Sequence, residues 1–442
     1  MAVGLLCLAA AAAYLQRNCL GVAESTIRGE FGLTKHQSGW ILSAFFWTYA
    51  IFQIPSGWLA DRWGSRRTLS LYAVLWSVAT VLMVFAGTWA TDVFPESFEW
   101  FGLTLSAALI WLLVTRLLGG AAQAGVFPCS AIIISDCVPE QKRGMATAWL
   151  GAFQQVGFVL ALVLTGWLLS GIGWRWTFAA YSIPGFLWAV FFFRRFRDGG
   201  DLDSETETAS IRVDEADSSP RQETHRREKP SPVPWLQLVS SPAMWLIAGQ
   251  QFCRGAGYIF YATWFPTFLQ ETRNVSVEKS GELTAMTILA ALAGALLGGM
   301  VSDWVLSRTG RQRLARQGLA VLGMLLCAGF IVLAFFVEDV VLAVAVISAG
   351  SFCASLAGPP GYTVTIGMGG KHVATVFGTM NMAGNVGAAL FPILVPYLLD
   401  LPGGWDLVLF VFAGLYLVAA VFWALLDANG SVFDQALIRS DS

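Results

Sequence analysis

The chain has 442 residues, of which 56% are hydrophobic and 13% charged, and its formal net charge is −2. Soluble domains carry roughly twice that share of charged residues, so the composition indicates a membrane protein and excludes an ordinary soluble domain. The seven cysteines and three histidines show no metal-ligand spacing, and we expect no metal and no cofactor.

Long apolar segments recur along the chain. A helix needs about 20 apolar residues to cross a bilayer, and we predict twelve crossings. Six lie near residues 1–23, 37–57, 68–87, 103–134, 144–170 and 176–194. Six more lie near residues 243–269, 281–304, 316–337, 340–366, 373–399 and 406–426. The expected fold is therefore all-α and transmembrane.

A polar segment separates the two sets of six. It contains prolines and many charged residues and is too poor in apolar residues to fold alone. We predict a first half at residues 1–195, a cytoplasmic linker at 196–236 and a second half with a short tail at 237–442. The short loops on the same side of the membrane as the linker contain ten Lys and Arg residues. The loops on the opposite side contain five. This asymmetry places both termini in the cytoplasm.

A motif is repeated after the second crossing of each half. The first copy is GWLADRWGSRR, residues 57–67, and the second copy occupies residues 299–311. An Asp at a helix end beside Arg can form a charge-assisted bond that breaks when the inner face opens, while Gly permits a tight turn. The alternative is that these residues only supply the positive charge that is usual in cytoplasmic loops. Two copies at matching places in the two halves argue against that alternative. The predicted gating residues are Gly57, Asp61, Arg62, Gly64, Arg67, Asp303 and Arg311.

Three charged side chains lie inside the predicted crossings: Arg17, Arg116 and Arg254. Each costs a few kcal/mol there by insertion scales, which makes a functional role the default. Because no acidic residue or histidine accompanies them, we expect a bound organic anion to supply the counter-ion, and the planar fork of Arg suits a carboxylate. The alternative for Arg17 is a side chain that reaches the outer interface. Arg116 has a structural role as its alternative.

Arg17 and Arg254 occupy equivalent places in the two halves, in the first and seventh crossings. We expect them to face one another across a central cavity, one from each half. A bound anion would then draw the two halves together.

These motifs resemble the major facilitator superfamily. Residues 57–67 are similar to its signature loop. The segments YLQRNCLGVA (14–23), RLLGGAAQAGVFP (116–128) and NMAGNVG (381–387) resemble its anion:cation symporter branch, which contains bacterial sugar-acid transporters, sialin and the vesicular glutamate transporters. The resemblance implies the major facilitator fold, with 12 helices in two pseudo-symmetric six-helix halves. It also implies a secondary transporter that exposes a central site alternately to each side of the membrane.

The resemblance assigns several substrate contacts. In the family, the residues that match Arg17 and Tyr49 bind the acid group, and Gln154 matches a substrate-contacting glutamine. Arg254 matches an arginine of the vesicular glutamate transporters. The predicted substrate-binding residues are Arg17, Tyr49, Gln123, Gln154, Arg254, Asn381, Asn385 and Tyr258. For the two asparagines, which share one helix face, helix–helix hydrogen bonding is the alternative.

The chain departs from the family at two positions. Many members carry an acid where this chain has Gln16 and Gln123, and proton coupling is ascribed to those carboxylates. Glutamine resembles a protonated Glu in shape but cannot titrate. Proton symport through these positions is therefore doubtful.

The expected function is transport of a small organic anion such as a hexuronate or aldonate. Alternatives are a phosphate or organophosphate exchanger and a non-transporting anion receptor. We expect no enzyme activity, because the sequence lacks hydrolase, metalloprotease and phosphate-loop motifs. The expected partners are the organic anion and the lipid bilayer, with no nucleic acid. A monomer in a bacterial inner membrane is expected.

Overall fold

The computed structural model describes residues 2–89, 97–100, 103–196, 234–428 and 430–433. The predicted linker, 196–236, falls almost wholly outside these ranges, and the domain boundaries stay a prediction. The side chains of Ile54, Asp61, residues 97–100, 103–105 and 140–144, Lys371 and Ala374 are also outside the description. The predicted gating contact of Asp61 is therefore not described.

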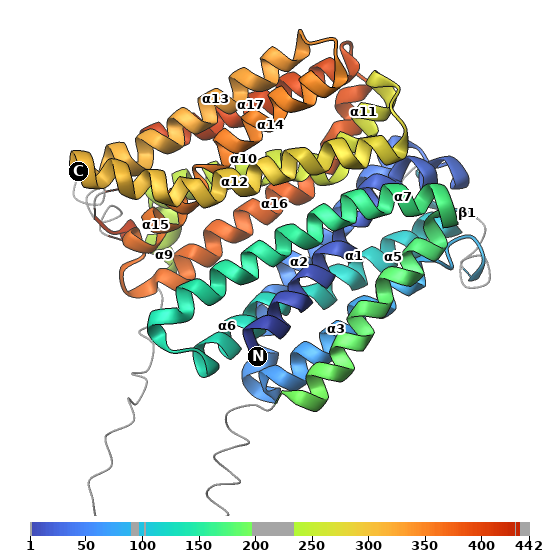
Figure 1. The fold of residues 1–442 in the computed structure, drawn as a ribbon, viewed down its shortest axis with the longest axis horizontal. Helices are drawn as coiled ribbons and strands as arrows, with labels where there is room; N and C mark the ends of the chain where they lie inside the picture. The colour runs from blue at the N-terminus through green and yellow to red at the C-terminus, as the bar shows by residue number, and fades with distance from the viewer. Residues whose placement is uncertain (1, 90–96, 101–102, 197–233, 429, 434–442) are drawn as a thin grey trace, which may run out of the picture.

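The helices of the described residues form two groups that lie side by side, one coloured blue to green and the other yellow to red (Figure 1). The first group contains α1 (Ala2–Phe31), α2 (Lys35–Trp63), α3 (Ser65–Met83), α5 (Ala107–Gln123), α6 (Val126–Cys137) and α7 (Glu140–Arg195). The second contains α9 (Trp235–Ser240), α10 (Pro242–Thr263), α11 (Phe265–Arg273), α12 (Val277–Thr309), α13 (Leu319–Phe335), α14 (Val340–Ser355), α15 (Gly358–Met368), α16 (Val373–Leu399) and α17 (Gly404–Leu425). A π-helical turn, Leu314–Gly318, leads into α13, and a 3-10 turn, Gly370–His372, precedes α16.

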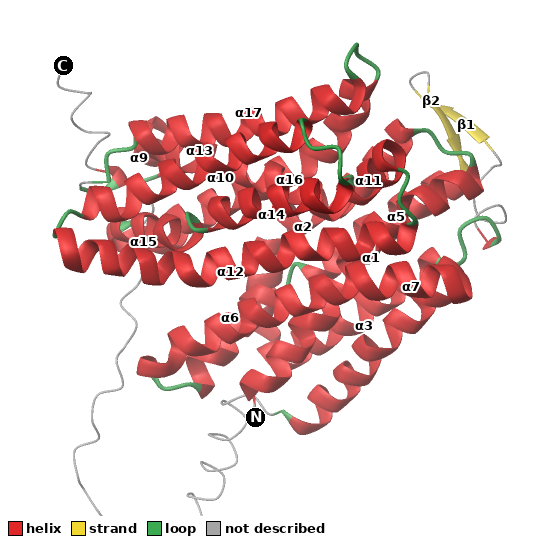
Figure 2. Cartoon of the chain, turned by 45° about the horizontal axis from the view of Figure 1, so that its top comes forward, coloured by secondary structure: helices red, strands yellow, loops and turns green. Residues whose placement is uncertain are grey.

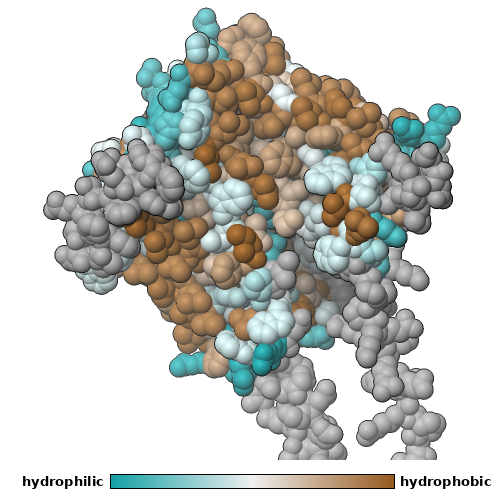
Figure 3. Space-filling view, turned by 180° about the vertical axis from the view of Figure 1, so that it is seen from behind, coloured by the Kyte–Doolittle hydropathy of each residue, from teal (hydrophilic) through white to brown (hydrophobic). Residues whose placement is uncertain are grey.

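The predicted number of crossings is confirmed. Eight stretches of the described helices are long and apolar enough to cross a membrane, and one of them, Met145–Arg195, has the length of two crossings. Its two parts meet at Gly173, where a φ of 76° breaks the helix. The more polar α2, α3 and α10 pack among these helices and complete the twelve. Figure 3 shows hydrophobic residues over most of the visible face, with hydrophilic residues toward its margins.

The repeated motif forms a tight turn in both halves. Gly64 lies between α2 and α3 with φ 84°, and Gly310 ends α12 with φ 65°. These are left-handed conformations that favour glycine. Asp303 and Arg311 are exposed, and no ion pair between them is recorded among the described residues. Their gating role stays a prediction.

A short β-hairpin lies at the start of the fourth crossing, where a helix was expected from residue 103. β1 (Ser97–Trp100) pairs antiparallel with β2 (Leu103–Ser106), and α5 begins only at Ala107 (Figure 2). The Ser106 side chain accepts a hydrogen bond from the Leu109 backbone N–H and caps the helix. The helix starts at this cap because residues 103–106 are paired with the first strand.

The hydrophobic core of the described residues has two parts. The larger part contains residues from both halves, including Cys19, Phe158, Phe260 and Leu283. The smaller part contains only residues at the inner ends of the first half, from Leu5 to Phe196 in sequence. The halves therefore share apolar packing toward the outside of the membrane, while the inner end of the first half packs on itself.

Polar contacts join the halves at the same outer end. Glu24 of α1 is buried; its carboxylate accepts from Arg28 at 2.8 Å and from the Thr267 hydroxyl of α11 at 2.9 Å. Glu271 of α11 pairs with Arg28 at 3.0 Å and with Lys35 of α2 at 2.6 Å. Every ion pair recorded between described side chains lies at this end. The structure is therefore closed toward the outside.

Neighbouring groups keep the carboxylate of Glu271 ionised. Burial alone would raise its pKa, but hydrogen bonds from Lys35 and Trp405 and the positive charges of Lys35 and Arg28 outweigh burial. The pKa of Glu271 lies below its ordinary value as a result. The carboxylate is ionised at neutral pH, and the contact between the halves persists there.

Glycine lets the helices of the two halves approach closely at the outer end. A methyl group at Gly21 of α1 would overlap the carbonyl oxygen of Ala262 in α10, and one at Gly281 of α12 would overlap that of Leu162 in α7. Outer closure therefore requires a position without a side chain at these points of contact.

We expect Gly21→Val to prevent outer closure, because the added side chain meets backbone that cannot move aside. In a cysteine-free chain carrying Ala388→Cys, which lines the central space, a membrane-impermeant thiol reagent added outside should label the variant at least ten-fold faster. Gly29→Val on the same helix, with open space around it, is the matched control. Equal labelling of both variants would contradict the expected role of Gly21.

Candidate functional site

Two adjoining cavities lie between the halves. The first, of about 150 Å³, is lined by α1, α2, α7, α10 and α16. The second, of about 320 Å³, is lined by α1, α7, α10, α12, α14, α15 and α17. Four residues line both, namely Tyr14, Gln251, Gly255 and Tyr258. The two cavities therefore adjoin at these four residues, which come from both halves and are called the partition below.

Arg17 lines the first cavity. Its side chain is 8% exposed and its guanidinium carbon lies 4.6 Å from the ring centre of Tyr14, 4.7 Å from that of Phe45 and 4.3 Å from that of Tyr49. The faces of these rings attract a cation that water no longer solvates. Arg17 therefore points into the protein and not toward the outer interface.

Gln123 holds the guanidinium of Arg17 in place. The Arg17 Nε donates to Gln123 Oε1 at 3.1 Å, and Gln123 Nε2 donates to the Ala13 carbonyl at 3.0 Å. Gln123 is buried and lines neither cavity. It positions the arginine from behind, and its amide uses both an acceptor and a donor, which a carboxylate could not do.

Arg116 lies beside Arg17 but outside both cavities. Its Nη1 donates to the Arg17 carbonyl at 3.4 Å, and its guanidinium carbon lies 4.8 Å from the Phe45 ring centre. This contact ties α5 to α1. It matches the structural alternative considered for Arg116, while its positive charge adds to that of Arg17.

Tyr49 contacts Arg17 through its ring and lines neither cavity. We expect Tyr49→Phe to transport within about two-fold of the wild type, because the ring face remains. Tyr49→Leu should lose about two- to 30-fold in affinity, which corresponds to a cation–π energy of about 0.5–2 kcal/mol. Uptake kinetics of the two variants measure this. Equal loss in both would instead assign the hydroxyl to the substrate.

Arg254 lines the second cavity from α10. Its Nε donates to Gln251 Oε1 at 3.2 Å, and its guanidinium carbon lies 5.7 Å from the Tyr362 ring centre. Arg17 and Arg254 therefore come from equivalent helices but line separate, adjoining cavities. We expected one cavity with the two arginines face to face; the structure places the partition between them.

No carboxylate of the described residues forms an ion pair with Arg17, Arg116 or Arg254. The buried acid nearest in sequence, Glu24, is occupied by Arg28 and Thr267. Buried charge without a partner is costly. The site therefore has the charge expected of a receptor for an anion.

The remaining predicted residues are divided between the cavities. Asn381 and Asn385 line the first, where Asn385 Nδ2 donates to the Asn381 carbonyl at 3.1 Å and Asn381 Nδ2 lies 3.4 Å from Gln53 Oε1 across the halves. Gln154 lines the second, and its Nε2 is buried without a hydrogen-bond partner among the described residues.

Tyr258 belongs to the partition. Its hydroxyl donates to Gln155 Oε1 of α7 at 3.0 Å, which joins the two halves at mid-membrane. Tyr258 lines both cavities.

Gln16 lies away from both cavities. Its Nε2 donates to the Tyr181 carbonyl at 2.6 Å, and its Oε1 accepts from the Thr80 hydroxyl at 3.0 Å. It is a packing contact among α1, α3 and α7.

The cavity residues that sequence reasoning missed include Tyr14, Gln155, Gln251 and Tyr362. A signal was present for two of them. Tyr14 precedes Arg17 by three residues and Gln251 precedes Arg254 by three, so each shares a helix face with its arginine. Tyr362 and Gln155 come from other helices, and their approach depends on tertiary packing.

A nearly all-helical membrane protein with two halves and a charged central site is the architecture of a carrier. Residues 6–366 match the family model of the Major Facilitator Superfamily, and the chain belongs to that family.

Similar proteins align with most of the chain. The probable sulfoacetate transporter SauU of Cupriavidus necator is 29% identical over 100% of this chain and 95% of its own. The probable galactarate/D-glucarate transporter GudP of Bacillus subtilis is 28% identical over 93% and 88%. The D-galactonate transporter of Escherichia coli is 27% identical over 87% and 85%.

Solved structures share the fold. A bacterial homologue of the human lysosomal transporter Spinster, in an inward-facing and unoccupied conformation, matches with a TM-score of 0.72 and 20% identity over 99% of this chain and 96% of that chain. The inward-open xylose transporter XylE of Escherichia coli matches with a TM-score of 0.68 and 14% identity over 96% of each chain. The expected fold is confirmed.

Proposed function

We propose that the chain transports a small organic anion of the sugar-acid class by alternating access in a bacterial inner membrane. Arg17 and Arg254 bind its acidic groups. One observation carries this proposal: both arginines line cavities between the halves, and no described carboxylate pairs with either. The family supports carriage rather than catalysis.

The two cavities favour a substrate with two acidic ends. A molecule that reaches across the partition would place one acid at Arg17 and the other at Arg254, one in each half. Sulfoacetate, galactarate and glucarate, which name the substrates of relatives, each carry two acidic groups. Such a ligand supplies both missing negative charges at once.

Polar side chains of the second cavity favour a hydroxylated substrate over a bare diacid. Gln154, Gln155, Gln251, Ser351 and Ser355 line it together with Tyr258 and Tyr362. Amides and hydroxyls of this kind pair with sugar hydroxyls, and a site built to bind a hydroxyl rejects an analogue that lacks it. A six-carbon sugar diacid therefore suits the site better than a two-carbon acid.

Gln16 and Gln123 limit the ways in which transport can be coupled to an ion gradient. Gln123 contacts Arg17, and Gln16 is bonded within the first half; neither can release a proton. Import of a monoanion against roughly 100 mV costs about 2.3 kcal/mol, a gradient of about 50-fold, and a dianion costs about twice as much. We therefore propose exchange, efflux or coupling to an ion other than the proton.

Counterflow in proteoliposomes tests this function. Vesicles loaded with galactarate should accumulate labelled galactarate, and external galactarate and glucarate should compete better than galactonate. Varying pH, Na⁺ and voltage separates the coupling modes. Competition by phosphate esters but not by sugar acids would instead show an organophosphate exchanger, and binding without counterflow would show a receptor.

A further inference from the structure

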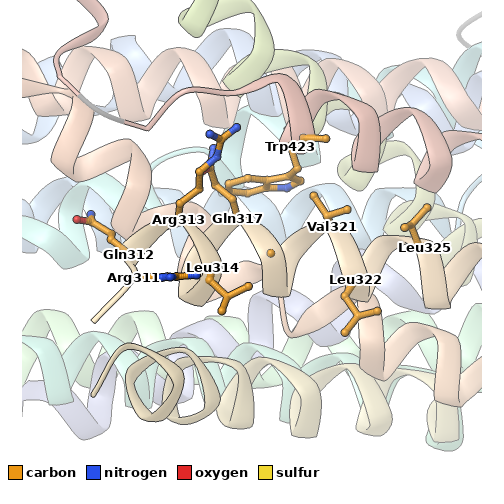
Figure 4. A pocket seen from close by; sticks show the side chains of 11 residues that line it. Arg311, Gln312, Arg313, Leu314, Gln317, Val321, Leu322, Leu325 and Trp423 are labelled. Carbon is orange, nitrogen blue, oxygen red and sulfur yellow. The ribbon is translucent and has the colours of Figure 1, made fainter. Parts of the chain in front are cut away.

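A groove lies at the inner end of the second half, away from the central site. It has a volume of about 720 Å³ and is lined by the turn Leu314–Gly318, the residues on either side of it and the end of α17. It shares no lining residue with the two central cavities. Figure 4 shows Arg311 and Arg313 at one end of the groove and Leu322 and Leu325 along α13 at the other.

The charged end of the groove is on the cytoplasmic side. Arg311 and Arg313 are exposed, and neither forms an ion pair with a carboxylate of the described residues. Arg308 in the last turn of α12 and Arg316 in the turn Leu314–Gly318 lie near them in sequence. Basic clusters next to the cytoplasmic leaflet attract anionic lipid headgroups.

The apolar wall of the groove runs into the bilayer. Leu314, Leu322 and Leu325 are 51%, 54% and 46% exposed, which places them on the lipid-facing surface. From Arg313 to Leu325 the helix rises about 18 Å at 1.5 Å per residue. This is close to the depth of one hydrocarbon leaflet, about half of the 30 Å core.

Two buried polar atoms beside the groove lack partners. Trp423 Nε1 and Gln317 Oε1 have no hydrogen-bond partner among the described residues, and both residues line the groove with exposures of 1% and 4%. An indole N–H donates to phosphate or ester oxygens, and an amide oxygen accepts from a hydroxyl. Groups of both kinds occur on a phosphatidylglycerol headgroup, whereas an acyl chain alone satisfies neither atom.

We propose that this groove binds an anionic phospholipid of the inner leaflet. Its phosphate lies at Arg311 and Arg313, and an acyl chain lies along Val321, Leu322 and Leu325. A soluble phosphate compound would use the arginines alone and leave the apolar wall empty. The proposal rests on this groove only and is independent of the transported substrate.

Native mass spectrometry of the full chain in detergent tests the proposal, with phosphatidylglycerol and phosphatidylcholine of identical acyl chains. We expect one phosphatidylglycerol to bind about 25-fold more tightly than phosphatidylcholine, because each of the two arginines contributes about a five-fold factor. Arg313→Gln should reduce that preference about five-fold and Arg311→Gln/Arg313→Gln about 25-fold, since each basic residue near the surface contributes about a five-fold factor. Arg308→Gln, at the end of α12 and outside the groove lining, is the charge-matched control.

Two comparisons in the wild type need no variant. Inorganic phosphate or glycerol 3-phosphate should not displace the bound lipid; displacement at similar concentrations would show a soluble-anion site and overturn the proposal. Equal binding of the two lipids would overturn it as well. So would an Arg308→Gln loss equal to that of Arg313→Gln, because the effect would then be one of loop charge rather than of the groove.

Discussion

Arg17→Gln should abolish measurable transport. The substitution keeps the side chain polar but removes the charge that faces the first cavity, and a bound acid group would then have no cationic partner in that cavity. Truncating one partner of a buried charge pair costs about 2–5 kcal/mol, which is a loss of about 30-fold to several-thousand-fold in affinity. Equilibrium binding and counterflow in proteoliposomes measure this loss directly.

Two variants separate the charge from the fold. Arg17→Lys keeps the charge but loses the planar fork, so it should retain part of the affinity. Arg194→Gln removes an exposed charge at the end of α7 and should leave transport unchanged. If Arg17→Gln bound substrate with wild-type affinity, Arg17 would not be the anion receptor.

Gln123→Glu should make transport depend on pH. The new carboxyl would lie at the position of the amide oxygen, 3.1 Å from Arg17 Nε. When ionised, it would neutralise Arg17 with an interaction on the order of 4 kcal/mol at an effective dielectric constant of 20. When protonated, it would resemble the native glutamine. Substrate affinity should therefore be highest at low pH and fall as the carboxyl loses its proton.

We expect the KM of Gln123→Glu to rise at least ten-fold between pH 5 and pH 8. The wild type is the reference and should have a constant KM over that range, because neither Gln123 nor Gln16 titrates. A wild-type chain with the same pH dependence would overturn the account of the two glutamines.

The fold could be predicted from the sequence because each crossing is a long apolar segment and the Arg-rich loops lie mostly on one side of the membrane. The β-hairpin was not predicted, although polar and apolar residues alternate in both of its strands, 97–100 and 103–106, because the apolar run that follows was extended back to residue 103. The hairpin depends on pairing with residues 97–100.

The candidate site could be predicted from the sequence only in part. Charge in an apolar segment identified Arg17 and Arg254, because such residues are rare and costly there. The partition between them could not be predicted, since two of its four residues, Tyr14 and Tyr258, are aromatic residues of a kind that usually packs between helices. Gln16 and Gln123 are both polar and buried, and only the coordinates show that one packs within the first half while the other holds Arg17.

The division of the hydrophobic core into a shared part and a separate part implies a response to temperature. The outer junction between the halves includes apolar contacts, and hydrophobic attraction weakens on cooling. The inner end of the first half has its own core and can keep its packing while the halves separate outside. Cooling should therefore shift the resting molecules away from the outward-closed form.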